Sequence, residues 1–107
     1  MKILKDILYK VNIDSVIEST EIRINKIEFN SLKIHKNDLF VAISGNILDG
    51  NQFILQAIKK GARVILCEIL PDIIIKNITY VKVKDIRESL SLICANYYGN
   101  PSKKLNL

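Results

Sequence analysis

Three short apolar runs in this chain have the length and composition of strands. The runs at 39–43 and 63–68 are continuous and rich in Val, Ile, Leu and Phe, whereas the run at 78–83 alternates apolar with polar side chains. Runs of about four to eight such residues, bounded by polar residues or glycine, are typical of β-strands. The two continuous runs predict strands that are buried on both faces, as in a parallel sheet.

Three other segments repeat their apolar residues along one helix face, since spacings of three and four residues align side chains. These residues are Ile3, Leu4, Ile7 and Leu8 in segment 2–10; Phe53, Ile54, Ala57 and Ile58 in segment 52–60; and Ile86, Leu90, Ile93 and Tyr97 after residue 85. Asp85 and Glu88 have the spacing of a capping box at the start of the third helix. We expect Asp49 or Asn51 to cap the second helix and Gly61 to end it.

Two segments have weaker patterns. Segment 11–20 mixes apolar and polar residues and predicts a loop or a short extended piece, whereas alternation around Ile22 and Ile24 predicts a strand near 22–29. Helices separated by strands in this order predict an α/β fold, a small layered sandwich whose mixed, partly parallel sheet is flanked by helices. The length of 107 residues fits one domain with a modest core.

A loop bracketed by Gly45 and Gly50 connects the predicted strand 39–43 to the helix 52–60. Such a loop presents backbone N–H groups and the positive end of a helix dipole, which together favour an anion. Glycine is also the usual residue of a tight turn, so the alternative is a strand-to-helix connection without a ligand. The loop matches neither a P-loop nor a dinucleotide fingerprint.

The chain is basic and rich in apolar residues. Its net charge is +5 and 49% of its residues are hydrophobic, which excludes an intrinsically disordered class. The charge suits an anionic ligand, but lysines spread over every element are also typical of a solvated surface. Without a basic stripe or an aromatic platform, a nucleic-acid-binding role with its steep salt dependence is disfavoured.

The cysteine and histidine content argues against a metal site. Cys67 falls in an apolar strand and Cys94 in an apolar helix, without CxxC spacing, so both are interpreted as free buried thiols. His35 is the sole histidine and lies between lysines in a predicted loop. No apolar run approaches the length of a membrane span and no leader pattern is present, so we expect a reducing, cytoplasmic environment.

Several short motifs together resemble the N-terminal domain of the Mur ligases, over essentially the whole chain. They are Asn-Ser-Leu at 30–32, Asn-Asp-Leu-Phe-Val-Ala-Ile at 37–43, Gly45, Asp49-Gly50, Phe53-Ile54, Ala57-Ile58, Gly61-Ala62 and Ala-Asn-Tyr-Tyr-Gly-Asn-Pro-Ser at 95–102. The last motif and the residues after it are most similar to the ligases that add diaminopimelate or L-lysine to UDP-N-acetylmuramoyl-L-alanyl-D-glutamate, in peptidoglycan precursor synthesis.

The resemblance implies a division of labour between domains. Residues 1–100 would dock the UDP end of the substrate, and 101–107 would begin the connection to a central domain that binds ATP and magnesium. The full enzyme would be an ATP-dependent ligase that activates the substrate carboxylate as an acyl phosphate, which the incoming amine attacks. This chain carries no ATP loop, so we expect it to hold no cofactor and to be inactive alone.

By position, the family's uridine-nucleotide contacts carry over to Phe29, Ser31, Asn46, Ile47 and Leu48. A serine hydroxyl can donate to a diphosphate or ribose, and the backbone amides of 46–48 can bond the uracil edge whatever their side chains. Phe29 can add an apolar contact for the ring.

The chain departs from the family pattern at three places. The family's Asp-Ser-Arg is Asn30-Ser31-Leu32 here, its Gly-Asp-Leu-Phe is Asn37-Asp38-Leu39-Phe40, and its Asp-Gly-His is Asp49-Gly50-Asn51. Leucine at 32 deletes a positive fork whose hydrogen bond to a charged group is worth about 1.5–3 kcal/mol. Lys33 and Lys36 are the nearest replacement cations, without the bidentate geometry of arginine.

Two alternative functions remain open at this point. The same general signature occurs in the ligase that adds D-alanyl-D-alanine, which is the nearest alternative within the family. A stand-alone α/β binding or interaction module is the alternative from another class, since fold does not fix function.

Overall fold

The computed structural model describes residues 2–42 and 47–99, and its centre is a five-stranded sheet with the spatial order β2-β7-β6-β5-β4. The strands are β2 (Ile13–Ile17), β4 (Ile27–Glu28), β5 (Leu39–Val41), β6 (Val64–Cys67) and β7 (Thr79–Val83). Strands β4 to β7 are parallel to one another, and β2 pairs antiparallel with β7 at one edge. The predicted α/β fold with a mixed sheet is confirmed.

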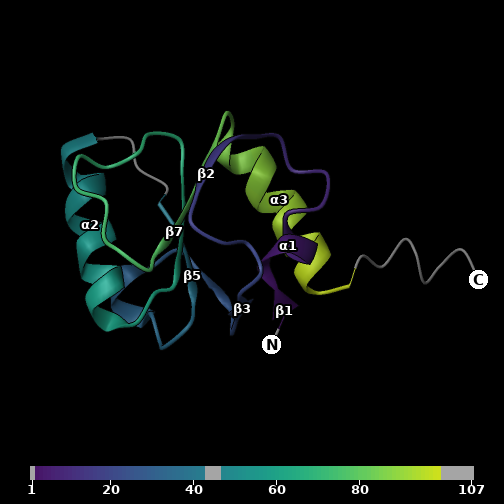
Figure 1. The fold of residues 1–107 in the computed structure, drawn as a ribbon, viewed down its shortest axis with the longest axis horizontal. Helices are drawn as coiled ribbons and strands as arrows, with labels where there is room; N and C mark the ends of the chain where they lie inside the picture. The colour runs from purple at the N-terminus through teal and green to yellow at the C-terminus, as the bar shows by residue number, and fades with distance from the viewer. Residues whose placement is uncertain (1, 43–46, 100–107) are drawn as a thin grey trace, which may run out of the picture.

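Helices cover both faces of the sheet, so the fold has three layers (Figure 1). Helix α2 (Ile47–Lys60) lies on one face, and α1 (Leu4–Ile7) and α3 (Ile86–Tyr97) lie on the other. The side-chain amide of Asn96 on α3 donates to the carbonyls of Ile7 and Tyr9, at 2.8 Å each. These bonds fix α1 and the turn after it against α3.

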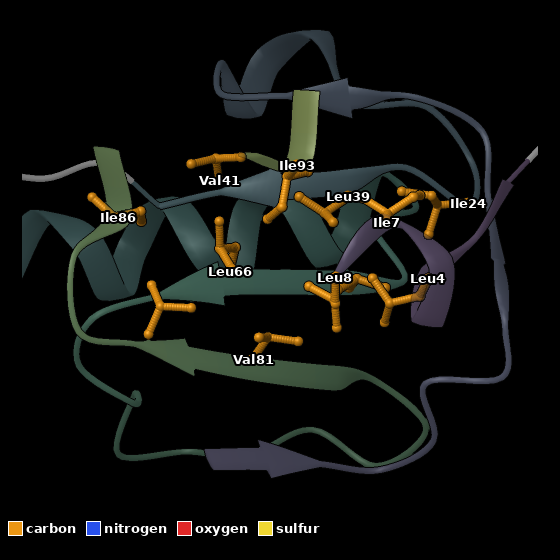
Figure 2. Close-up of a cluster of buried hydrophobic side chains, with 12 residues drawn as sticks. Leu4, Ile7, Leu8, Ile24, Leu39, Val41, Leu66, Val81, Ile86 and Ile93 are labelled. Atoms are coloured by element: carbon orange, nitrogen blue, oxygen red, sulfur yellow. The ribbon is translucent and has the colours of Figure 1, made fainter. Parts of the chain in front are cut away.

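Alternate residues of the strands form two separate hydrophobic cores, because successive side chains of a strand point to opposite faces. The core under α1 and α3 contains Leu39 and Val41 of β5, Val64 and Leu66 of β6, and Val81 and Val83 of β7, with Leu4, Ile7, Leu8, Ile24, Ile86 and Ile93 (Figure 2). The core under α2 contains Phe40, Ile65, Cys67 and Tyr80 with Ile34, Ile54, Ala57, Ala62 and Ile78. Strands β5 and β6 are therefore buried on both faces, as predicted.

The N-terminal helix is shorter than the predicted 2–10. Lys2–Ile3 form strand β1, which pairs antiparallel with β3 (Arg23–Ile24), and α1 covers only Leu4–Ile7. Residues 8–10 form a turn after α1, and Lys10 ends this turn in a left-handed conformation with a φ of +66°. The amphipathic pattern still identified the buried side chains Leu4, Ile7 and Leu8, whereas Ile3 is exposed.

The predicted strand 22–29 consists of two short strands in different sheets. β3 pairs with β1, and β4 joins the main sheet beside β5. The chain bends between them at Asn25, whose N–H donates to the carbonyl of Asn37 at 2.8 Å. Segment 11–20 contains β2, so its extended interpretation is correct.

Helix α2 begins at Ile47, five residues before the predicted start near 52. Asp49 and Asn51 lie inside the helix, so the prediction that either caps it is wrong. Gly50 is also helical, so it does not bound a loop. An interior glycine costs a helix only about 1 kcal/mol relative to alanine, which the rest of α2 offsets.

The ends of the helices agree better with the prediction. Gly61 follows α2 with a φ of +120°, and Gly99 follows α3 with a φ of +74°. A Cβ on Gly61 would lie 2.8 Å from Cα of Lys36, so the turn before β5 packs directly on this glycine. No helix among the described residues is long and apolar enough to cross a membrane.

Candidate functional site

The carboxyl ends of the parallel strands lie along one edge of the sheet, which is where α/β folds usually bind their ligands. Phe29 and Ser31 follow β4 at this edge, and α2 starts a few residues after β5. Glu68 follows β6 and Asp85 follows β7. The predicted nucleotide contacts thus belong to two adjacent connections, those after β4 and β5.

The start of α3 is already occupied by the protein's own carboxylates. Asp85 Oδ1 accepts the backbone N–H groups of Arg87 and Glu88, at 3.0 and 3.1 Å, which confirms Asp85 as the cap. Glu68 Oε2 accepts the N–H of Ile86 at 2.8 Å. Negative charge at this position satisfies the helix dipole and its free amides. The start of α3 is therefore not available to an anionic ligand.

Ser31 is buried, with 5% of its surface exposed, and it opens the 3-10 turn η1 (Ser31–Lys33). Its hydroxyl donates to Gln56 Oε1 on α2 at 2.7 Å. Ser31 does not stand at an open surface, because η1 packs against α2 and the hydroxyl joins the two elements. The bond leaves the lone pairs of the hydroxyl oxygen free to accept.

Phe29, which precedes this turn, is 66% exposed, and Leu32 within it is 63% exposed. Phe53 on α2 is exposed as well and lies three residues before Gln56, on the same helix face. Exposed aromatic and aliphatic side chains thus flank the partly buried Ser31–Gln56 hydrogen bond. Such a surface can pack against a planar ring.

The other predicted contacts are only partly described. Asn46 and the end of the predicted strand at Ile43 lie outside the described residues, and Ile47 and Leu48 are known as the first residues of α2. Gln56 is nine residues after the helix start, which corresponds to about 13 Å along the axis. A ligand that touches both Ser31 and the start of α2 must therefore extend along this helix.

The two lysines proposed as substitutes for the family arginine lie at different places. Lys33 closes η1 and is exposed near the candidate site. Lys36 packs against Gly61 at the far end of α2. The helix of 14 residues separates Lys36 from the start of α2 by about 20 Å. Of these two lysines, Lys33 is the one that lies in the same turn as Ser31.

Glu28 supports the predicted site and was not recognised in the sequence. Its Oε2 accepts the backbone N–H groups of Phe29 and Asn30, at 3.1 Å each, and its Oε1 accepts from Lys26 Nζ at 3.2 Å. Burial alone would raise the pKa of Glu28, but these hydrogen bonds and the charge of Lys26 outweigh it and lower the pKa. The available signal was the alternation of opposite charges at 26 and 28, which places both on one face of a strand.

Lys26 connects this carboxylate to a second one, that of Asp38 just before β5. Lys26 Nζ lies 3.2 Å from Asp38 Oδ2, which also accepts the N–H of His35 at 2.7 Å. Asp38 is fully buried, and its Oδ1 has no hydrogen-bond partner among the described residues. Burial would lower the pKa of Lys26, but its hydrogen bonds and ion pairs with Asp38 and Glu28 raise it.

The remaining candidate groups show no catalytic arrangement in the described part of the chain. Cys67 is buried and Cys94 partly buried, and both are free thiols. His35 is exposed in the turn before β5. Within residues 2–42 and 47–99, no three His, Cys, Asp or Glu side chains are grouped to hold a metal ion.

Comparison with known proteins matches residues 23–98 to the family described as Mur ligase family, catalytic domain. The UDP-N-acetylmuramoyl-L-alanyl-D-glutamate--2,6-diaminopimelate ligase of Cytophaga hutchinsonii is 41% identical over 105 residues, and that of Clostridium tetani is 42% identical over 106 residues. Each alignment covers 97% of this chain and 22% of the relative. Among solved structures, MurF from Acinetobacter baumannii has a similar fold, with a TM-score of 0.56 and 27% sequence identity. The match covers 68% of this chain and 16% of the MurF chain.

Proposed function

The chain belongs to the Mur ligase family, and we propose that it docks the UDP end of UDP-N-acetylmuramoyl-L-alanyl-D-glutamate for a ligase of peptidoglycan precursor synthesis. The observation that carries this proposal is the arrangement at the carboxyl edge of the sheet. There the exposed ring of Phe29, the Ser31 hydroxyl and the start of α2 belong to adjacent connections. The 2,6-diaminopimelate ligases that share about 40% of its residues support the choice of substrate.

In this proposal each group has a separate role. Phe29 offers its face to the uracil ring, and the Ser31 oxygen accepts from or donates to the ribose or diphosphate. The backbone N–H groups of Asn46, Ile47 and Leu48 bind oxygens of the nucleotide at the helix start, where the dipole favours negative charge. The nucleotide lies along α2, because Ser31 contacts this helix well past its first turn.

The chemistry of amide-bond formation belongs to another part of the full enzyme. The chain spans about a fifth of the curated relatives it matches, and its 107 residues contain no glycine-rich phosphate loop of the kind that holds ATP and magnesium. The residues present therefore do not fit an ATP–magnesium site. We propose residues 1–100 as the docking domain and 101–107 as the connection to a cytoplasmic ligase's central domain, so the chain alone is inactive.

The nearest alternative is the D-alanyl-D-alanine-adding ligase, since the solved structures similar in fold include a MurF and a D-alanyl-D-alanyl ligase, both from Acinetobacter baumannii. Their sequence identity of 27% is well below the 41–42% of the diaminopimelate ligases. Both readings place the UDP end of the substrate on this domain, so UDP affinity does not separate them. An assay of the full-length enzyme with diaminopimelate and with D-alanyl-D-alanine as the incoming amine does separate them.

Isothermal titration calorimetry with UDP and with UDP-N-acetylmuramoyl-L-alanyl-D-glutamate tests the proposal. Binding of both, with UDP displacing the larger ligand, is the expected result.

Phe29→Ala should weaken UDP binding at least about fivefold, because stacking of a base on an aromatic ring contributes about 1–3 kcal/mol. Tyr9→Ala, which removes an equally exposed ring beside α1, is the matched control and should change nothing. Absence of heat and of competition at millimolar UDP would refute the docking role.

A further inference from the structure

One ion pair closes the segment that carries Phe29 and Ser31. At the start of the segment, the Glu28 carboxylate holds two successive backbone N–H groups. At its end, Lys26 Nζ donates to the carbonyl of Lys33 at 3.0 Å. Because Lys26 and Glu28 also bond to each other, the five residues between 28 and 34 form a loop tied at both ends by the same two side chains.

The pair is itself fixed to the interior of the fold. Lys26 Nζ reaches the fully buried carboxylate of Asp38, which is in turn bonded to the backbone of His35. Inside the loop, Asn30 Oδ1 accepts the N–H of Leu32 at 2.9 Å and so shapes the 3-10 turn. Few degrees of freedom remain for the residues between these anchors.

From this arrangement we propose that the Lys26–Glu28 ion pair is a positioning device that holds Phe29 and Ser31 in the geometry that binds the nucleotide. This inference rests on the proposed function and adds residues that the nucleotide contacts do not include. Glu28 acts through its neighbours rather than on the ligand. Its carboxylate already occupies the two nearest amides and would repel a diphosphate that approached it.

The charge of Lys26 completes this role. An unpaired carboxylate beside an anion site would oppose binding of UDP, and the ammonium group 3.2 Å away offsets it. The ammonium is shared among two carboxylates and a carbonyl, so it is not free to take a phosphate in place of the family's arginine. Lys26 therefore also serves the loop rather than the ligand.

The test compares UDP affinity, melting temperature and amide exchange in Glu28→Gln, Lys26→Met and the double variant. Glu28→Gln keeps the shape but removes the charge, and we expect about tenfold weaker UDP binding, because charge-assisted hydrogen bonds are lost. Exchange at the Phe29 and Asn30 amides should accelerate in the same variant. Glu21→Gln, an exposed glutamate ahead of β3, is the matched control and should match the wild type.

The double variant tests whether Lys26 and Glu28 act as a pair. Each side chain ties one end of the loop and the ion pair joins the two ties, so we expect the double variant to lose less UDP affinity than the sum of the two single losses. Fully additive losses would mean that Lys26 and Glu28 act independently and would overturn the role of the pair. Faster amide exchange with UDP affinity unchanged would make the pair purely structural and overturn it too. A wild-type chain that does not bind UDP would instead refute the proposed function on which the inference depends.

Discussion

At the scale of single residues, the polar side chains around the candidate site are engaged with one another before any ligand arrives. Ser31 bonds to Gln56, which is 25 residues away in sequence, and Glu28 bonds to the two residues that follow it. A motif can indicate that a serine belongs to a nucleotide site. It cannot reveal the partner on another element, because no periodicity relates the two positions.

Ser31→Ala should lower both stability and UDP affinity. The loss of a buried hydrogen bond lowers the free energy of unfolding by about 1 kcal/mol, as measured by urea denaturation. Gln56→Ala removes the same bond but keeps the serine hydroxyl. We expect it to be similarly destabilised while losing less UDP affinity by calorimetry. If Ser31→Ala binds UDP like the wild type, the hydroxyl serves only the fold.

At the scale of elements, the longer helices and strands were predicted from the sequence, whereas the two-residue strands were not. The runs at 39–43, 63–68 and 78–83 and the helix after Asp85 were predicted correctly in type, because each contains enough consecutive or periodic apolar residues to show its type. Two-residue strands such as β1 and β3 contain no repeat, so they were missed or merged with neighbours. The start of α2 was misplaced because Gly50 resembles a turn signal, although the helix passes through it.

Gly61→Ala tests the contact between the end of α2 and the turn before β5. We expect a loss of about 3 kcal/mol in the free energy of unfolding, because the added Cβ meets backbone atoms and the φ of +120° is open only to glycine. Gly99→Ala is the matched control. Its φ is also positive, but nothing lies within 4 Å of the new Cβ, so the loss should be about 1 kcal/mol. Equal losses in thermal or urea unfolding would show that the contact with Lys36 is unimportant.

At the scale of the whole molecule, the core under α2 makes the stability of the fold depend on alkaline pH, because it buries the Cys67 thiol. Burial raises the pKa of the Cys67 thiol from 9.0 to about 11, although the charge of Lys82 opposes this rise. Between these values the unfolded chain releases a proton that the folded chain keeps. Stability therefore falls as pH rises through this range and is unaffected by this group below pH 8.

This prediction is measured with a Cys94→Ser variant, in which Cys67 is the one remaining thiol. At pH 8, Ellman's reagent should modify Cys67 only as fast as the folded chain opens, since the thiol is 2% exposed. In the urea-unfolded chain, Cys67 should react with the reagent at once. The variant's free energy of unfolding should decrease between pH 9 and 11 by more than that of a Cys67→Ala/Cys94→Ser chain. Rapid modification under native conditions would place Cys67 outside the core.

The sheet ends differently at its two borders. On one side β4 has only two residues, and on the other the register of β2 against β7 shifts between Ile13 and Ser15. A short edge strand and an irregularly paired edge strand do not present the long, flat row of free backbone groups on which a second molecule could add a strand. In a chain this rich in isoleucine, these two borders disfavour pairing of the native sheet with the sheet of another copy.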